Sequence, residues 1–266
     1  MTHKARKRFG QNFLHDHNII YTIIAHIQAR ENQHWVEIGP GQGALTAPLL
    51  AQNVQLDVVE LDRDLVELLQ RKFSQQPKLK IHSADALNFD FAALAQSDEK
   101  LHIIGNLPYN ISTPLMFHLL ESCDCIADMH FMLQKEVVDR ICATPGSKQY
   151  GRLSVMMQYY CQGECLFEVP PESFEPIPQV MSAIIRLIPH LQPPVIVTSV
   201  ESLNQVVTQA FSQRRKTIRN SLKNLLTEEQ IAGLGINPSV RAETLSLEEF
   251  ATLSNFVANT CDNLTQ

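Results

Sequence analysis

Short apolar runs alternate with helical patterns along the first 190 residues of the chain. Four runs are brief, rich in Val, Ile and Leu and bounded by polar residues, which is typical of buried parallel strands. They occupy residues 35–38, 56–59, 79–82 and 101–104. Apolar residues at helical spacing lie around them, at residues 18–27, 62–73, 113–120, 135–142 and 151–161. Asp62 is the expected cap of the second of these helices, and a further helix is possible after residue 87. Strands that alternate with helices predict an α/β fold with a doubly wound parallel sheet.

The pattern changes in the second half of the chain. Residues 129–133 predict a further strand, and residues 163–169 and 183–188 predict antiparallel strands at the sheet edge. The proline-rich segment 190–194 is the best candidate for a linker. Beyond it, short helical patterns predominate. We therefore predict one domain over residues 1–190 and a small all-helical domain over residues 196–266.

Composition adds the broad class of protein. The chain has 266 residues, of which 44% are hydrophobic and 19% charged, as in soluble globular proteins. No apolar run approaches the roughly 20 residues that span a bilayer. The amino-terminal stretch lacks the apolar core of a signal peptide. We expect a cytoplasmic, monomeric protein without a membrane partner. The six cysteines form no Cys-x-x-Cys pair, so we expect reduced thiols and no metal site.

The charge is unevenly distributed, although the net charge is −6. Basic residues cluster in the arm formed by residues 1–14 and again between residues 202 and 227, and neither stretch contains an acid that could serve as a local partner. Such patches predict binding of a polyanion such as RNA. The wheel of residues 211–225 predicts one helix with an apolar stripe and a basic shoulder. The candidate RNA-binding residues are Arg6, Lys7, Arg8, Arg214, Arg215, Lys216, Arg219 and Lys223.

A glycine-rich turn follows the first strand. Gly39, Gly41 and Gly43 allow a tight turn and a close approach of backbone to a ligand. The spacing formally satisfies the dinucleotide fingerprint, so an NAD-dependent oxidoreductase is a rival interpretation. Glu37 before the loop, Glu60 after the second strand and Asp85 after the third favour S-adenosylmethionine. Asp85 as a helix cap and Glu60 as a solvated acid are the alternatives.

The fourth strand ends in Ile103-Ile-Gly-Asn-Leu-Pro-Tyr109. Gly105 and Pro108 predict a tight loop that turns Asn106 and Tyr109 toward a cleft at the carboxyl end of the strand. An amide oxygen, a backbone carbonyl and an aromatic ring suit a flat ring that carries an amino group. The alternative is a structural turn with a buried tyrosine.

Several motifs together resemble the rRNA adenine N6-dimethyltransferases, and within that family the branch that modifies bacterial small-subunit rRNA. They cover nearly the whole chain and occur in the family's order. The motifs are Asn12-Phe-Leu14, Glu37-Ile-Gly-Pro-Gly41, Glu60-Leu-Asp62, Asp85-Ala, Asn106-Leu-Pro-Tyr-Asn-Ile-Ser-Thr113, Gln134-Lys-Glu136, Tyr150-Gly-Arg-Leu-Ser154 and Phe211-Ser-Gln-Arg-Arg-Lys-Thr-Ile-Arg219. One departure is Met181, which stands where the family pattern has an acid.

The resemblance implies a Rossmann-like methyltransferase domain with a helical carboxyl-terminal domain that binds RNA. It also implies dimethylation of two adjacent adenosines near the 3′ end of 16S rRNA on a pre-30S particle, with S-adenosylmethionine as methyl donor. A non-catalytic assembly factor on the same fold is the second rival. The implied cofactor-binding residues are Asn12, Leu14, Gly39, Gly41, Glu60, Asp85 and Asn106.

The expected chemistry centres on the loop after the fourth strand. The side-chain oxygen of Asn106 and the carbonyl of Leu107 would accept hydrogen bonds from the adenine amine, Pro108 would stiffen the loop, and Tyr109 would stack on the base. Phe174 is the candidate for the opposite face of the base. A core phenylalanine is the equal alternative for that residue.

Overall fold

The computed structural model of the protein describes residues 11–95 and 99–262. Seven strands form the main sheet in the order β4-β3-β2-β5-β6-β9-β7 within this part of the chain. Neighbouring strands from β4 to β6 in this order are parallel, and β9 lies antiparallel to β6. The strands are β2 (His34–Ile38), β3 (Gln55–Glu60), β4 (Leu79–Ser83), β5 (Leu101–Asn106), β6 (Ile126–Gln134), β7 (Cys161–Val169) and β9 (Ser182–Pro189). The expected parallel sheet with an antiparallel edge is confirmed.

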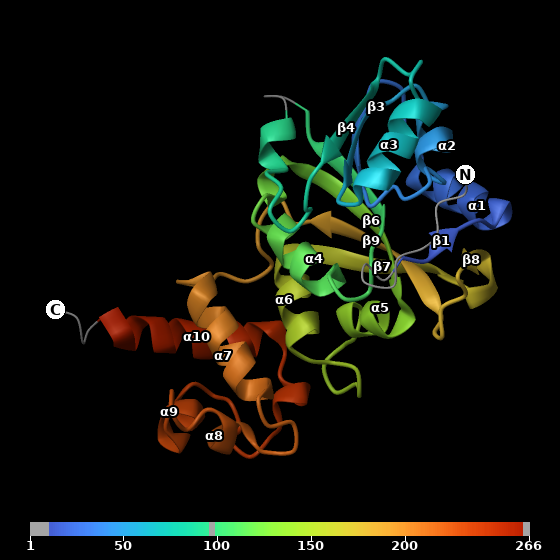
Figure 1. Ribbon diagram of the computed structural model, residues 1–266. Coiled ribbons are helices and arrows are strands. Elements are labelled where there is room, and N and C mark those ends of the chain that lie inside the picture. The colour runs from blue at the N-terminus through green and yellow to red at the C-terminus, as the bar shows by residue number, and fades with distance from the viewer. Residues whose placement is uncertain (1–10, 96–98, 263–266) are drawn as a thin grey trace. The chain divides into compact units, whose positions relative to one another are not determined.

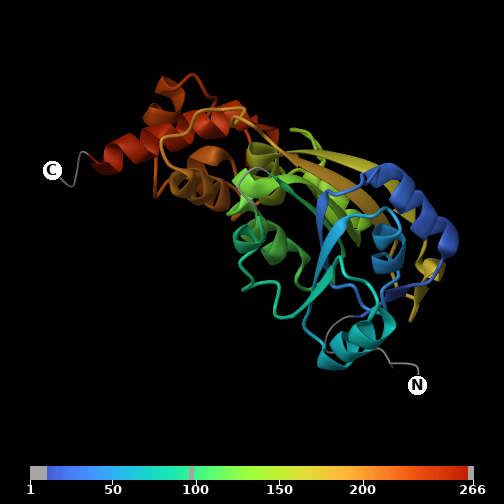
Figure 2. The same cartoon turned by 90° about the horizontal axis from the view of Figure 1, so that it is seen from above.

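Helices cover both faces of this sheet, as a doubly wound fold requires (Figure 1). Ile23 and Ile27 of α1 pack in one core cluster with Trp35 and Val58 of the strands. Leu49 of α2 lies in the same cluster, so α1 and α2 pack on the same face, and Figure 2 shows α4 on the other side of the sheet. The helices of this region are α1 (His17–Ile27), α2 (Thr46–Leu50), α3 (Arg63–Lys72), α4 (Ser112–Leu120) and α5 (Lys135–Ile141).

Local chemistry explains where these helices begin. Asp16 caps α1 by accepting hydrogen bonds from the backbone N–H groups of Asn18 and Ile19. Asp62 caps α3 by accepting from Asp64 N, as the sequence predicts. The possible helix after residue 87 is only a short 3₁₀ turn, Ala92–Leu94.

A buried carboxylate, that of Asp57, lies within the sheet beside two histidines. The Asp57 carboxylate is reached by His34 Nε2 at 2.7 Å and by His82 Nε2 at 2.5 Å. Because an unpaired buried carboxylate is costly, the two imidazoles make this position tolerable inside the sheet.

The structure contains a second, two-stranded sheet that the sequence does not predict. Strand β1 (Phe13–Leu14) pairs antiparallel with β8 (Phe174–Glu175), so that Leu14 lies opposite Phe174. Each strand has two residues, which is too short to show an alternating pattern. This pairing ties the segment around Asn12 to a distant part of the chain.

The chain forms two compact units. The first holds the described residues up to Val138 together with Glu164–Pro189, and the second holds Asp139–Gly163 together with those from His190 onward. The sequence places a boundary at residue 190, but it does not anticipate that residues 139–163 group with the helical part. Periodicity identifies a helix in this stretch without identifying its packing partner.

The second unit is built around α7 (Val200–Phe211). Helices α6 (Arg152–Tyr160) and α10 (Leu247–Asp262) pack against it. The ring of Phe211 lies 6.2 Å from that of Tyr150 and 5.8 Å from that of Phe250, measured between centroids. Aromatic contacts of this kind explain why residues 139–163 belong with the helices.

The expectation of one helix over residues 211–225 is wrong. Helix α7 ends at Phe211, and α8 (Ile218–Ser221) begins only after a turn. Thr217 forms a bridge with Arg241, and Ile218 N donates to Val240 O at 2.8 Å. Because this pairing takes the backbone into an extended conformation at Thr217, a continuous helix cannot form. A third helix, α9 (Glu228–Gly233), follows.

The close packing around Gly105 predicts that a larger residue there would destabilise the protein. A Cβ atom at this position would lie 2.6 Å from the backbone oxygen of Ile38, which cannot move away cheaply. Gly105→Ala should lower the free energy of unfolding by about 1–3 kcal/mol because it overpacks two adjacent strands. Urea denaturation measures this change. Gly233→Ala is the matched control, because a Cβ there meets nothing within 4 Å. Equal stability of the two variants would contradict the close approach of β2 and β5.

Candidate functional site

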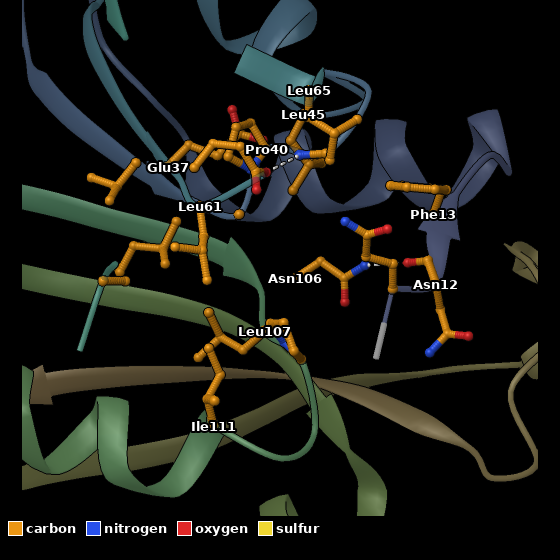
Figure 3. A pocket seen from close by; sticks show the side chains of 18 of the residues that line it. Asn12, Phe13, Glu37, Pro40, Leu45, Leu61, Leu65, Asn106, Leu107 and Ile111 are labelled. Atoms are coloured by element: carbon orange, nitrogen blue, oxygen red, sulfur yellow. Dashed lines mark hydrogen bonds between the residues drawn. The ribbon is translucent and has the colours of Figure 1, made fainter. Parts of the chain in front are cut away.

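A cavity of about 230 Å³ lies in the first unit, at the carboxyl ends of β2, β3 and β5. This edge adjoins the point where the strand order reverses, where doubly wound folds bind their ligands. The lining comes from residues 11–14, most of residues 37–45, residues 59–61 and 84–87, and residues 106–111. Figure 3 shows Glu37, Pro40 and Leu45 on one side of the space and Leu107 and Ile111 on the other.

The glycine-rich loop after β2 needs its glycines. Gly39, Gly41 and Gly43 all have positive φ, at 66°, 56° and 80°. A Cβ at Gly43 would lie 2.7 Å from the ring of Phe73, and one at Gly41 would lie 3.1 Å from the ring of Phe13. The loop is therefore held in a conformation that side chains would block, with its backbone against the cavity.

Two buried carboxylates stand behind this loop. Glu37 is 2% exposed and accepts a hydrogen bond from Thr46 Oγ1 at 2.6 Å. Glu60 is 7% exposed and accepts from Asp62 N at 2.9 Å and from Gly41 N at 3.3 Å. Burial raises the pKa of Glu37 to about 7 and also raises the pKa of Glu60. A ligand that brings hydroxyl donors or positive charge would stabilise both in their ionised form.

Asp85 lines the cavity and also organises its own turn. Its Oδ1 accepts from Leu87 N at 3.0 Å, and its Oδ2 accepts from Asn88 Nδ2 at 3.2 Å. Asp85 therefore stabilises a turn and does not cap a helix, because no helix begins at this point. The turn does not remove the residue from the cavity, because each carboxylate oxygen can accept a second hydrogen bond.

The loop after β5 is braced from several directions. Asn106 Nδ2 donates to the backbone oxygen of Asn12 at 3.0 Å (Figure 3), which leaves its amide oxygen as the acceptor end. Leu107 N donates to Met132 O at 3.2 Å. The Pro108 carbonyl accepts from Ile111 N and Ser112 N, both at 3.1 Å. The loop therefore presents Asn106 to the cavity in a defined orientation.

Tyr109 is half-buried and lines the cavity, so it is not a fully buried structural residue. Its hydroxyl lies 2.9 Å from Ser182 Oγ, and its carbonyl accepts from Ser112 Oγ at 3.2 Å. Ser182 was not among the expected site residues, because a single serine after Met181 forms no recognisable motif.

Residues 11–14, which include β1, line another side of the cavity. Asn12 and Leu14 lie in the lining, as expected, together with Phe13, which the sequence analysis did not propose as a site residue. Phe174 lies elsewhere: its side chain is 1% exposed and packs in the core with Leu14. The structure does not bring Phe174 to the cavity and supports the core alternative, because its pairing with Leu14 directs it inward.

The basic residues of the second unit are exposed, but two of them have acidic neighbours. Arg219 Nη1 lies 2.9 Å from Glu228 Oε1, and Arg214 Nε lies 3.8 Å from Glu243 Oε2. Arg214 also donates to the carbonyl of Lys148. The expectation that these cations lack a local carboxylate is wrong, because folding returns acids from beyond residue 227.

The other basic residues fall into two groups. Arg215, Lys216 and Lys223 are exposed in the second unit. Arg6, Lys7 and Arg8 lie outside the described residues.

Two further expectations concern metals and membranes. Within the described residues, no group of three His, Cys, Asp or Glu side chains is arranged to hold a metal ion. None of the helices in that part of the chain is long and apolar enough to cross a bilayer.

Met181 is half-buried, and its carbonyl accepts from Lys135 N at 2.9 Å, a contact that needs no acidic side chain.

Comparison with known proteins gives a family and a fold. Residues 2–259 match the family model described as ribosomal RNA adenine dimethylase. A Pseudomonas aeruginosa protein named ribosomal RNA small subunit methyltransferase A is 56% identical over 96% of this chain and 96% of its own length. An Aeromonas hydrophila protein of the same name is 54% identical over 97% of this chain and 96% of its own length.

Solved structures have the same architecture. A dimethyladenosine transferase from Plasmodium falciparum has a TM-score of 0.75 at 23% identity, over 91% of this chain and 95% of its own. The 23S rRNA methyltransferase ErmE has a TM-score of 0.71 at 25% identity, over 93% of this chain and all of its own. The α/β fold is thus Rossmann-like and of the methyltransferase type.

Glu37 generates a prediction about pH. A buried acid with a raised pKa binds its proton more tightly in the folded state, so its contribution to stability falls as pH rises from 4.5 to about 7. Glutamine mimics the protonated acid and keeps an acceptor for Thr46. Glu37→Gln should therefore match the parent near pH 4 and exceed its unfolding free energy by about 3 kcal/mol at pH 8. Urea denaturation across this range measures the difference. A constant difference at all pH values would contradict the titration of Glu37.

Proposed function

The chain belongs to the ribosomal RNA adenine dimethylase family, and from this premise we propose that it dimethylates N6 of two adjacent adenosines near the 3′ end of 16S rRNA, using S-adenosylmethionine. The observation that carries the proposal is the placement of Asn106. Its amide oxygen stands in a cavity beside the glycine-rich loop, while its amide nitrogen is occupied by Asn12.

The cavity residues fit the cofactor. Glu60 can accept hydrogen bonds from the two ribose hydroxyls, and Asp85 can accept from the adenine amino group. Backbone at Gly39 and Gly41 allows the methionine part to approach closely, and Asn12 and Leu14 close the other side. Glu37 places buried negative charge near a ligand that carries positive charge. When bound, S-adenosylmethionine supplies an electrophilic methyl group on sulfur.

The protein activates the target amine by positioning it. The lone pair of an adenine N6 is delocalised into the ring, so the amine is a poor nucleophile. Hydrogen bonds from its two hydrogens to Asn106 Oδ1 and the Leu107 carbonyl favour a pyramidal nitrogen with its lone pair directed at the methyl group. The nitrogen becomes acidic once the new bond forms, so the reaction needs no dedicated base.

Tyr109 would hold the flipped base by stacking, which contributes about 1–3 kcal/mol per base. Pro108 stiffens the loop that carries the ring. Phe174 would act indirectly, by packing under Leu14, rather than as the second face of the base.

The helical unit and the amino-terminal arm would supply the RNA contacts. Arg214, Arg215, Lys216, Arg219 and Lys223 lie on the surface of the second unit. The arm residues Arg6, Lys7 and Arg8 add a second basic segment. We propose a pre-30S ribosomal particle in the cytoplasm as the substrate, a monomeric enzyme, and a contribution to 30S biogenesis.

One experiment separates the rival functions. Purified protein is mixed with S-adenosylmethionine and with undermethylated small subunits, and the rRNA is analysed by mass spectrometry. The proposal predicts two dimethyladenosines. Absence of transfer with intact RNA binding would favour an assembly factor, and calorimetric binding of NAD in place of S-adenosylmethionine would favour an oxidoreductase.

The Asn106 assignment generates a prediction about catalysis. Asn106→Ala removes one acceptor for the amine, so the rate of methyl transfer should fall on the order of 100-fold while the fold persists. Single-turnover assays measure the rate, and circular dichroism checks the fold. Gln75→Ala is the matched control, since Gln75 is an exposed amide that does not line the cavity. An Asn106→Ala enzyme as active as this control would refute the role of Asn106.

The basic surface generates a prediction about binding. Removing Arg215 and Arg219 together should weaken RNA binding and reduce the slope of log K against log salt by about 0.7–0.9 for each lost phosphate contact. Filter binding at several salt concentrations measures the slope. The charge-matched control replaces Arg30 and Arg71, two exposed arginines of the first unit. If the double variant keeps the slope of the parent protein, other basic residues must make the phosphate contacts.

A further inference from the structure

The ring of Tyr109 has a polar tether that its proposed stacking role alone does not require. Stacking uses the face of the ring, and the hydroxyl is not part of it. The side chain is only half-buried, so packing alone leaves the ring some freedom. Yet its hydroxyl lies 2.9 Å from Ser182 Oγ. The contact spans 73 residues of sequence and exists only because of the fold.

Ser182 is well placed to act as a fixed anchor. It is the first residue of β9, it is 1% exposed, and it pairs with Gln134 of β6 in the antiparallel ladder. A buried hydroxyl is costly without a hydrogen-bond partner, and the partner of this hydroxyl is Tyr109. The backbone of the sheet therefore fixes one end of the tether.

We propose that Ser182 is a positioning residue that sets the plane of the Tyr109 ring for stacking on the target adenine. This inference rests on the proposed function, because it assigns Ser182 a role in the same site. Ser182 touches neither substrate nor cofactor in this scheme and acts through Tyr109 alone.

The tether completes the bracing of the loop after β5. Asn106 Nδ2 donates to Asn12 O, Leu107 N donates to Met132 O, and the Tyr109 hydroxyl bonds with Ser182 Oγ. Three separate segments of the chain therefore hold the three functional residues of this loop in place. The first two bonds orient the acceptors for the amine. The third orients the surface on which the base rests, so that the base is presented to those acceptors in one plane.

The test is a double-mutant cycle in single-turnover methyl transfer at saturating RNA. Ser182→Ala and Tyr109→Phe each remove the same bond, so each should slow transfer by about threefold to tenfold, the effect of one neutral hydrogen bond. The double variant should be no slower than either single variant, and cofactor affinity should not change. Ser182→Thr, which keeps the hydroxyl, should restore part of the rate. Additive losses, or no loss, would overturn the proposal.

A second readout is independent of activity. Fluorine NMR of protein labelled with 3-fluorotyrosine reports the ring of Tyr109 directly, with Tyr109→Phe to assign its signal. Ser182→Ala should shift and broaden this signal, whereas Ser154→Ala, which removes a different buried hydroxyl, should leave it unchanged. An unchanged Tyr109 signal in Ser182→Ala would overturn the inference. If the parent protein itself does not methylate rRNA, the proposed function is refuted instead. The two failures can therefore be told apart.

Discussion

The arrangement of the site depends on the close approach of β2 and β5. Ile38 pairs with Gly105 in the parallel ladder, and there is no room for a side chain at Gly105 beside the Ile38 carbonyl. Both strands end at this level, so the glycine-rich loop and the loop that carries Asn106 leave the sheet side by side. Both loops therefore line the same cavity.

Charge burial around the glycine-rich loop is the second feature of the site. Glu37 and Glu60 are nearly inaccessible, and burial raises the pKa of each. The fold tolerates this cost because Thr46, Gly41 and Asp62 donate hydrogen bonds to the two carboxylates. Buried carboxylates with raised pKa values are common where a ligand stabilises the ionised form, which agrees with a cationic cofactor.

The second unit illustrates a different use of charge. Its arginines lie on the surface, and Glu228 and Glu243 approach two of them. Exposed ion pairs contribute little to stability, so RNA phosphates could replace these carboxylates at small cost. The acidic net charge of the chain is therefore compatible with RNA binding on one surface.

The sheet, the glycine-rich loop and the order of the chemical motifs can all be predicted from the amino-acid sequence. Repeated apolar runs and glycine spacing are local signals, and the strands at residues 35–38 and 101–104, for example, appear as expected. A capping aspartate such as Asp62 is equally local, which is why the start of α3 could be predicted.

Contacts between residues far apart in the sequence emerge only in the folded chain. Folding placed Phe174 under Leu14 instead of beside the cavity, broke the expected basic helix at Thr217 by pairing it with Arg241, and joined Tyr109 to Ser182. None of these outcomes has a periodic signature, because each depends on a contact between segments far apart in sequence. Local pattern fixes an element and its exposed face, whereas the partner of that face is chosen by packing of the whole chain.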